Sequence, residues 1–214
     1  MTDSHVLSRR PKTPTQERGE RRVADLLRAA EHLFGTLGYE ATSMSGIAQL
    51  AGASIGSLYQ FFPSKESIGS ALLLQYMNEL SDRLERWKTV LPSSPRVFGQ
   101  KLVTIVFDYV SQRPACHVLA DTPSLVPQSY GMEKLSGSVQ ELLSTFAPSM
   151  KVTELSAVAL AASLMVRATL QGGRMVDSKR AALLRREMQQ ALGSYLEERL
   201  NPDVYRTATT KMQR

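Results

Sequence analysis

The sequence is poor in the residues that most catalytic and metal sites use. Its 214 residues include one cysteine, three histidines and one tryptophan. A single cysteine excludes an intramolecular disulfide and fits a reducing compartment. The sequence contains no metal-ligand cluster, no phosphate-binding loop and no nucleophile–base pair. It therefore predicts neither an enzyme nor a bound cofactor or metal.

The chain also lacks a long hydrophobic run. Its first residues, MTDSHVLSRRPKTP, contain no apolar core of a signal peptide. The most apolar stretch, 155–170, is interrupted by Ser156, Ser163, Arg167 and Thr169. It is too short to span a bilayer, which takes about 20 residues. We therefore expect a soluble cytoplasmic protein without membrane contact.

Positive charge is in excess but is not concentrated in one segment. A net charge of +6 and an isoelectric point near 9.6 permit a polyanionic partner. Residues 1–17 read as a flexible basic tail that contains Arg9, Arg10 and Lys12. This tail is either solvated or lies along DNA phosphates or in a minor groove. Bulk charge alone does not decide between these readings.

Residues 42–66, TSMSGIAQLAGASIGSLYQFFPSKE, are the most informative part of the sequence. They predict a short helix, a tight turn, a second helix over about 55–62 and the start of a third. Gly52 suits the left-handed conformation that ends a helix, and Ser54 suits the N-cap of the next one. Two short helices joined in this way form a helix-turn-helix, whose second helix enters the DNA major groove.

Spacing within the second helix predicts which side chains are buried. Ile55, Leu58 and Phe62 are three and four residues apart, so we expect all three to face inward. Gly56 costs about 1 kcal/mol relative to alanine inside a helix. Either a packing contact or the close approach of another backbone, such as DNA, would justify it. Lys65 stands at a helix N-terminus, which favours anions, so its positive charge is unfavourable there unless a phosphate lies nearby. The alternative interpretation is that Lys65 is simply a solvated side chain.

This run resembles the helix-turn-helix of TetR (tetracycline-repressor-like) transcriptional regulators, and the likeness covers about residues 18–78. The shared pattern is a Thr/Ser-rich start, I-A, a glycine at the turn, S-x-G-x-L-Y-x-x-F and then S-K-E. Ile55 stands where the family often has a basic or polar residue, and Gln60 and Phe61 stand where His or Tyr is common. These departures bear on which DNA sequence is read. Beyond about residue 80 only the size and the helical pattern are similar.

The rest of the chain predicts helices and almost no strand. We expect an all-α fold with a three-helix helix-turn-helix DNA-binding domain over 18–78, its helix-turn-helix at about 43–62. A helical bundle for effector binding and dimerisation is expected over 79–200, and a tail over 201–214. The nine or so predicted helices span about 18–37, 43–51, 55–62, 65–91, 96–112, 115–121, 129–146, 153–171 and 178–200, with Gly172-Gly173 joining the last two.

Side-chain chemistry assigns roles in DNA binding. Gln60 can pair bidentately with adenine N6 and N7, with Ser57 and Ile55 as secondary base contacts, Ile55 only if it is not core. Phe61 either lies beside the DNA backbone or packs against the linker helix. Thr42, Ser43, Ser45, Tyr59 and Lys65 suit phosphates, which position the protein without specifying sequence. The full predicted set is Thr42, Ser43, Ser45, Ser54, Ile55, Gly56, Ser57, Tyr59, Gln60, Phe61 and Lys65.

The last two predicted helices carry small and apolar residues at helical spacing. These faces pack within one subunit or, as the resemblance implies, form a four-helix homodimer interface. A twofold dimer would present two recognition helices about 34–36 Å apart and read a palindromic operator. The residues concerned are Ala157, Leu160, Ala161, Leu164, Ala168, Ala181, Leu184, Met188, Ala191 and Tyr195.

The resemblance also implies a small-molecule pocket in the C-terminal bundle. The candidates to line this pocket are Trp87, Phe107, Tyr109, His117, Met132, Met165 and Arg167. For most of them the alternative role is ordinary core packing. Arg167 lies in the apolar run LAASLMVRATL, where an unpaired buried charge is very costly. Its partner is either an acidic effector or a Glu or Asp of the bundle or of a second subunit. His117 and Asp121 are four apart and can pair.

Taken with the resemblance, these features predict a repressor that a small effector releases from its operator. The alternative is a DNA-binding adaptor whose bundle binds a protein partner instead of a small ligand. A tightly packed bundle with an exposed apolar patch would favour that alternative. Cys116 has no basic neighbourhood in the sequence that would support a redox-sensing thiol.

Overall fold

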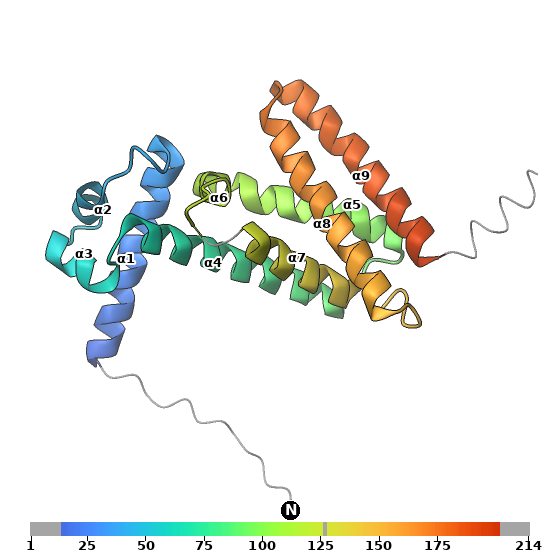
Figure 1. Cartoon of the computed structure of the whole chain (residues 1–214), viewed down its shortest axis with the longest axis horizontal. Helices are drawn as coiled ribbons and strands as arrows, with labels where there is room; N and C mark the ends of the chain where they lie inside the picture. Colours follow the sequence, from blue (N-terminus) through green and yellow to red (C-terminus); the bar gives the residue numbers. More distant parts are fainter. Residues whose placement is uncertain (1–13, 126–127, 202–214) are drawn as a thin grey trace, which may run out of the picture.

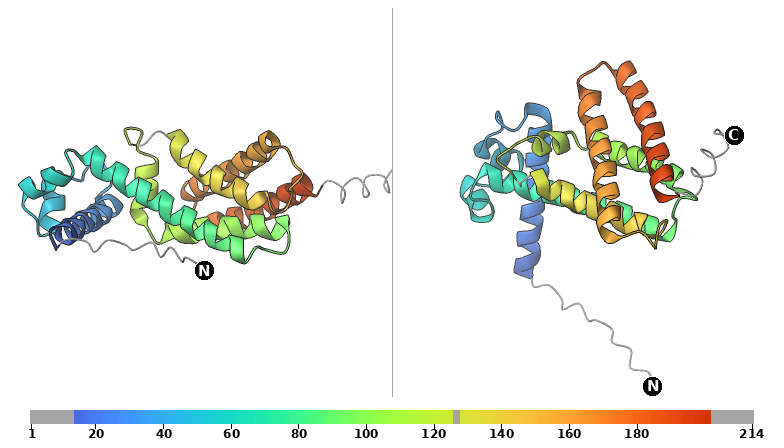
Figure 2. Two further views of the ribbon diagram at one scale, coloured as in Figure 1. Left: turned by 90° about the horizontal axis from the view of Figure 1, so that it is seen from below. Right: turned by 45° about the vertical axis from the view of Figure 1, so that its right-hand side comes forward.

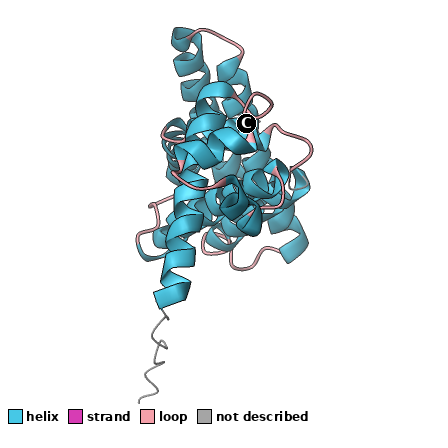
Figure 3. Ribbon diagram, turned by 90° about the vertical axis from the view of Figure 1, so that its left-hand side faces the viewer, coloured by secondary structure: helices cyan, strands magenta, loops and turns pink. Residues whose placement is uncertain are grey.

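The computed structural model describes residues 14–125 and 128–201. Within them every regular element is helical: nine α-helices, one short 3₁₀ helix and no strand (Figures 1 and 3). The predicted all-α fold is confirmed. The helices are α1 (Pro14–Leu37), α2 (Met44–Leu50), α3 (Ile55–Phe61), α4 (Lys65–Glu85), η1 (Arg86–Thr89), α5 (Pro95–Ser111), α6 (Pro114–Ala120), α7 (Gln128–Leu143), α8 (Val152–Arg174) and α9 (Ser178–Leu200).

Helices α1 to α3 form a compact group at one end of the elongated molecule (Figures 1 and 2). Leu26 and Phe34 of α1, Ile47 of α2 and Leu58 of α3 are fully buried together. On α1 the buried Leu26, Ala30 and Phe34 follow one another at four-residue intervals, which places them on one inward stripe. This cluster continues into α6, since a Cβ on Gly35 would lie only 3.1 Å from Pro114 Cβ.

Helix α4 connects this group to the larger bundle. Its N-cap is Ser64, whose side chain accepts from Ser67 N while the Ser67 hydroxyl accepts from Ser64 N, a complete capping box. Ile68 near its start is buried in the first core, and Leu84 near its end is buried in the second. The sequence predicted one helix over 65–91. In the structure α4 ends at Glu85, and the chain continues as the 3₁₀ helix η1.

The second core lies between α5, α7, α8 and α9. Helices α5 and α9 approach very closely through glycines: a Cβ on Gly99 would lie 3.0 Å from Gly193 N and from Leu192 O. Phe98 is fully buried beside them and meets Trp87 and Phe146 edge-on. Close backbone contact and aromatic packing fix α9 against the α5 scaffold.

Helix α8 corrects the prediction that Gly172-Gly173 joins the last two helices. Both glycines lie inside α8, and the connection is residues 175–177, with Asp177 as the N-cap of α9. A Cβ on Gly172 would lie 3.0 Å from Leu184 Cδ2, so this glycine serves helix packing. Packing against α9 therefore outweighs the intrinsic cost of glycine in a helix.

Helix α8 is also longer than the apolar stretch predicted over 155–170. Among the described residues it is the one helix that is long and apolar enough to cross a membrane, by length and composition alone. The expectation that this segment is too short is therefore wrong. In the structure 39% of its most apolar window is buried, and α8 packs between α7 and α9. A core helix passes the same test, so this is weak evidence for a membrane span.

Candidate nucleic-acid interface and bundle cavity

Two serine caps set the start of each helix of the helix-turn-helix. The Ser43 hydroxyl accepts from Gly46 N at 3.1 Å and opens α2. The Ser54 hydroxyl accepts from Ser57 N at 3.1 Å and opens α3. Each cap satisfies a backbone donor that the first turn of a helix would otherwise leave free.

Gly52 makes the turn between α2 and α3. Its φ of 60° lies in the left-handed region, as predicted. Ala53 N then donates to Ala48 O at 2.9 Å, and Gly52 N donates to Gln49 O at 3.1 Å. This paired pattern terminates α2 and redirects the chain into α3.

The two faces of α3 differ from the prediction in one residue. Leu58 is fully buried and Phe62, the C-cap, is nearly so. Ile55 is 44% exposed, which corrects its assignment to the inward face. Ile55 is the first residue of the short helix α3 and follows the exposed N-cap Ser54. At this end of the helix its side chain does not reach the core in which Leu58 is buried.

The outward face of α3 presents Tyr59, Gln60 and Phe61 to solvent. The alternative in which Phe61 packs against the linker helix is therefore not what the structure shows. A Cβ on Gly56 would meet nothing within 4 Å, so no packing contact among the described residues explains this glycine. The space over Gly56 is open to an external group.

Two of the predicted phosphate contacts are engaged inside the domain. Thr42 is only 2% exposed, and its hydroxyl donates to Gly38 O at 2.8 Å, so its assignment to a phosphate is corrected. Lys65 Nζ donates to Tyr39 O at 2.8 Å and to Glu40 O at 3.2 Å. It also lies 4.5 Å from the Tyr39 ring centroid. Lys65 thus holds the α1–α2 loop against α4 and is not a solvated side chain.

Ser43 and Ser45 remain exposed at the start of α2, with their hydroxyls 3.2 Å apart. Arg22, which sequence reasoning did not single out, donates to Gly52 O at 3.4 Å and ties α1 to the turn. Its position on a long charged helix gave no signal of this contact. The predicted basic residues Arg9, Arg10 and Lys12 lie outside the described residues.

The bundle contains a cavity of about 570 Å³ that α4, α5, α6, α7 and α8 line. Five of the predicted residues do line it: Phe107, Tyr109, His117, Met132 and Arg167. Trp87 and Met165 do not, which corrects their assignment. Trp87 follows α4 and packs 5.5 Å from Phe98, centroid to centroid, and Met165 packs against the same second core.

Helix α4 supplies cavity residues that the sequence reasoning missed. Leu73, Tyr76, Met77 and Leu80 line one wall at three- and four-residue spacing. That spacing was the available signal, but it predicts ordinary core packing equally well. Tyr76 is the informative member, since its hydroxyl donates to Glu31 Oε1 on α1 at 2.9 Å.

Three charged residues line the cavity, and two of them pair. Arg174 donates to Asp121 Oδ2 at 2.5 Å, so Asp121 does not pair with His117 as predicted. Within the described part of the chain, no hydrogen bond or ion pair reaches Arg167, which is half-buried. The predicted alternative of a carboxylate in the same bundle is therefore not observed there.

Burial lowers the pKa of His117, the Arg174 charge lowers it further, and Asp121 opposes them. The imidazole is consequently neutral at neutral pH. Burial raises the pKa of the Cys116 thiol to about 12, so this side chain is a thiol and not a reactive thiolate.

A network of hydrogen bonds around Glu79 joins α4 to Tyr109 of α5 and to Arg113, which follows α5. Glu79 Oε2 accepts from Tyr109 at 3.1 Å and from Arg113 at 2.7 Å, while Gln75 donates to Glu79 Oε1 at 2.9 Å. Burial raises the pKa of Glu79, but these hydrogen bonds and the Arg113 charge outweigh it. The net pKa of Glu79 is below its ordinary value.

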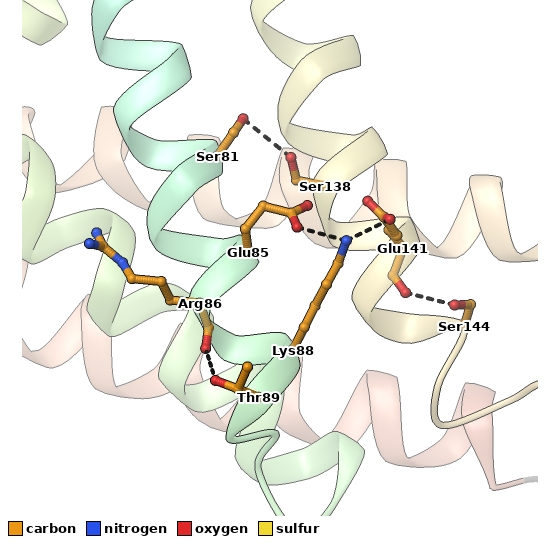
Figure 4. A network of polar contacts seen from close by, with 8 residues as sticks. All are labelled: Ser81, Glu85, Arg86, Lys88, Thr89, Ser138, Glu141 and Ser144. Atoms are coloured by element: carbon orange, nitrogen blue, oxygen red, sulfur yellow. Dashed lines mark hydrogen bonds and ion pairs between the residues drawn. The ribbon is translucent and has the colours of Figure 1, made fainter. Parts of the chain in front are cut away.

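Helix α4 and the following η1 are tied to α7 beside the cavity, where Ser81 lines it (Figure 4). Lys88 Nζ contacts Glu85 at 2.7 Å and Glu141 at 2.6 Å, and Ser138 donates to Ser81 at 3.2 Å. Exposed ion pairs contribute little to stability. Their effect is to align the two helices that form this side of the cavity.

Residues 26–72, which include both capped helices, match the family model described as bacterial regulatory proteins, tetR family. This segment of the chain is a TetR-type helix-turn-helix domain. A TetR-family transcriptional regulator from Streptomyces coelicolor has a similar fold, with a TM-score of 0.65 and 23% identity. That similarity covers 82% of this chain and 97% of the other.

Two curated relatives are similar to part of this chain. One is the uncharacterized HTH-type transcriptional regulator YuxN of Bacillus subtilis, 32% identical over 85 residues. The other is the HTH-type transcriptional repressor KstR2 of Mycolicibacterium smegmatis, 36% identical over 76 residues. The matches cover 40% and 36% of this chain, but only 29% and 36% of those relatives.

Proposed function

We propose that this chain is a cytoplasmic, dimeric TetR-family repressor that binds a palindromic DNA operator and leaves it when a small effector binds. The observation that carries the proposal is the outward face of α3. Its exposed Tyr59, Gln60 and Phe61 stand on a helix that buries Leu58 and is capped at Ser54. A rigid short helix with a free polar and aromatic face suits the major groove.

The roles at the DNA follow from which groups are free. Gln60 reads an adenine through its amide, and exposed Ile55 contacts a thymine methyl. Tyr59, Ser43 and Ser45 contact phosphates, which fix the register of the helix. The open space over Gly56 admits the sugar–phosphate backbone. Ser57, the next residue of α3, supplies a secondary base contact.

Dimerisation is proposed through α8 and α9. On α8, Leu160 and Leu164 are 42% and 49% exposed, with Ala157 and Ala168 exposed beside them. Exposed leucines flanked by alanines allow a second pair of helices to approach closely. These four residues lie on a face of α8 that the described part of the chain leaves exposed. A twofold dimer matches a palindromic operator.

The cavity supports a small effector over a protein partner for the bundle. A volume of about 570 Å³ lies in the range of roughly 300–1,000 Å³ that small-molecule sites occupy. We assign residues 18–78 to DNA binding and 79–200 to effector binding and dimerisation. An effector that prefers the conformation with misplaced recognition helices releases the operator.

Selection from a pool of random duplexes tests this proposal. The purified full-length protein is expected to enrich one palindromic motif, and its affinity is expected to fall steeply with added salt. Recovery of random sequences at every salt concentration contradicts sequence-specific binding. Enrichment of a single half-site without a symmetric mate contradicts the twofold dimer.

A further inference from the structure

We infer that the cavity binds an amphipathic monocarboxylate, a molecule with one carboxylate on Arg167 and a long apolar chain along α4 and α7. The inference rests on the proposed function, because it names the chemical class of the effector that this cavity takes. Three independent features of the cavity support it: its walls, its charge balance and the engagement of its other polar groups.

The walls of the cavity combine flexible apolar side chains with the aromatic rings of Tyr76, Phe107 and Tyr109. Leu73, Met77 and Leu80 of α4 line the cavity together with Met132 and Leu135 of α7. Methionine is unbranched and polarizable, so it adapts to an apolar chain of variable shape. The flexible side chains of α4 and α7 can conform to an alkyl chain.

The charges lining the cavity do not balance. Arg174 is neutralised by Asp121, and the low pKa of His117 leaves its imidazole uncharged at neutral pH. Arg167 remains as a guanidinium without a partner in the described part of the chain. A half-buried unpaired charge is unfavourable, and a single negative charge from a ligand compensates it.

Several other polar groups of the cavity are already engaged. The hydroxyls of Tyr76 and Tyr109 donate to Glu31 and Glu79, respectively, and Ser81 accepts from Ser138. His117 and Gln171 line the cavity as neutral groups, so Arg167 is its one charged donor without a partner in the described part of the chain. Its planar guanidinium matches a carboxylate with two parallel hydrogen bonds. One free cation fits one negative charge, not the two charges of a phosphate monoester.

Calorimetry with three probes of equal chain length tests this inference on the purified full-length protein. The probes are dodecanoate, its methyl ester and dodecyltrimethylammonium, each kept below its micelle concentration. Wild type is expected to bind dodecanoate about tenfold to a hundredfold more tightly than the ester and to reject the cation.

Substitutions at Arg167 localise the effect. Arg167→Gln is expected to abolish the preference for the carboxylate over the ester, whereas Arg167→Lys retains part of it. Arg86→Gln is the matched control, because Arg86 is an exposed arginine at the far end of α4 and does not line the cavity. It is expected to leave the preference unchanged, and circular dichroism verifies folding of each variant.

Contrary results are distinguishable from failure of the proposed function. Equal binding of ester and carboxylate, or no binding of either, overturns the monocarboxylate class even if wild type binds its operator. An Arg167→Gln variant that weakens the dimer but keeps the preference overturns it too, because Arg167 then pairs across subunits. Dodecanoate binding with the expected preference supports the inference even if no operator is found.

Discussion

The hydroxyl of Tyr76 on α4 donates a hydrogen bond of 2.9 Å to Glu31 Oε1 on α1. Tyr76 also lines the cavity, so one side chain contacts both the ligand space and the first helix of the α1–α3 group. A ligand that displaces the Tyr76 ring must shift or break this bond. Differential contacts of this kind are what a conformational switch requires.

Removing this hydroxyl is expected to destabilise the fold. Tyr76→Phe keeps the buried ring but leaves Glu31 without its donor, at a cost of about 1–2 kcal/mol in the free energy of unfolding. Urea denaturation followed by circular dichroism measures it. Tyr195→Phe is the control, since no hydrogen bond is recorded for that half-buried hydroxyl within the described ranges. Equal losses in the two variants would show that the Tyr76–Glu31 bond contributes nothing.

The two faces of α3 are expected to respond oppositely to truncation. Leu58→Ala opens a cavity in the first core and should cost about 2–5 kcal/mol of unfolding free energy. Ile55→Ala removes an exposed side chain and should change stability by less than about 0.5 kcal/mol. Thermal unfolding compares them, and operator binding should fall for Ile55→Ala although it remains folded. A large stability loss for Ile55→Ala would place it in the core after all.

The pKa of Glu79 predicts how stability depends on pH. Since its folded pKa is below its unfolded value, its contribution is complete above the unfolded pKa, about 4.3. It is lost as the pH falls through the folded pKa. Unfolding free energies measured from about pH 6 to about pH 3 should fall more steeply for wild type than for Glu79→Gln. Parallel curves would mean that the hydrogen bonds to Glu79 do not favour its charged form.

Glycine-to-alanine substitutions should distinguish glycines that allow close helix packing from glycines that make no packing contact. Gly99→Ala forces a Cβ against the backbone of α9 and should cost about 1–3 kcal/mol. Gly137 is exposed on α7 with nothing within 4 Å of a Cβ, so Gly137→Ala should stabilise by about 0.5–1 kcal/mol. Chemical denaturation of both variants decides this. Stabilisation by Gly99→Ala would contradict the close contact between α5 and α9.

Local signals in the sequence predicted most of the fold. Gly52 and Ser54 have strong backbone preferences that act within a few residues, so the turn and cap they predicted are present. Predictions that depended on distant partners failed more often. Gly172 looked like a linker because the approach of Leu184 from α9 is invisible in one sequence. Ile55 had the spacing of a core residue but is exposed at the first position of α3, whereas Leu58 and Phe62 are buried.

The residues that line the cavity were predicted only in part. Arg167 stood out because a charge in an apolar run needs a reason, whereas Trp87 was chosen for its ring and lies in the second core. Tyr76 was missed because a buried tyrosine on an amphipathic stripe resembles any core residue. Which side chains border empty space depends on how helices cross, and periodicity does not encode that.

The most direct test of the central claim is operator binding by wild type, Gln60→Ala and Tyr59→Phe across a salt series. We expect Gln60→Ala to lose about 1–3 kcal/mol of discrimination at one base pair of each half-site, with the salt dependence unchanged. Tyr59→Phe should weaken binding to all sequences alike. Unchanged base preference in Gln60→Ala, with wild-type affinity in both variants, would contradict the account in which the exposed face of α3 reads DNA.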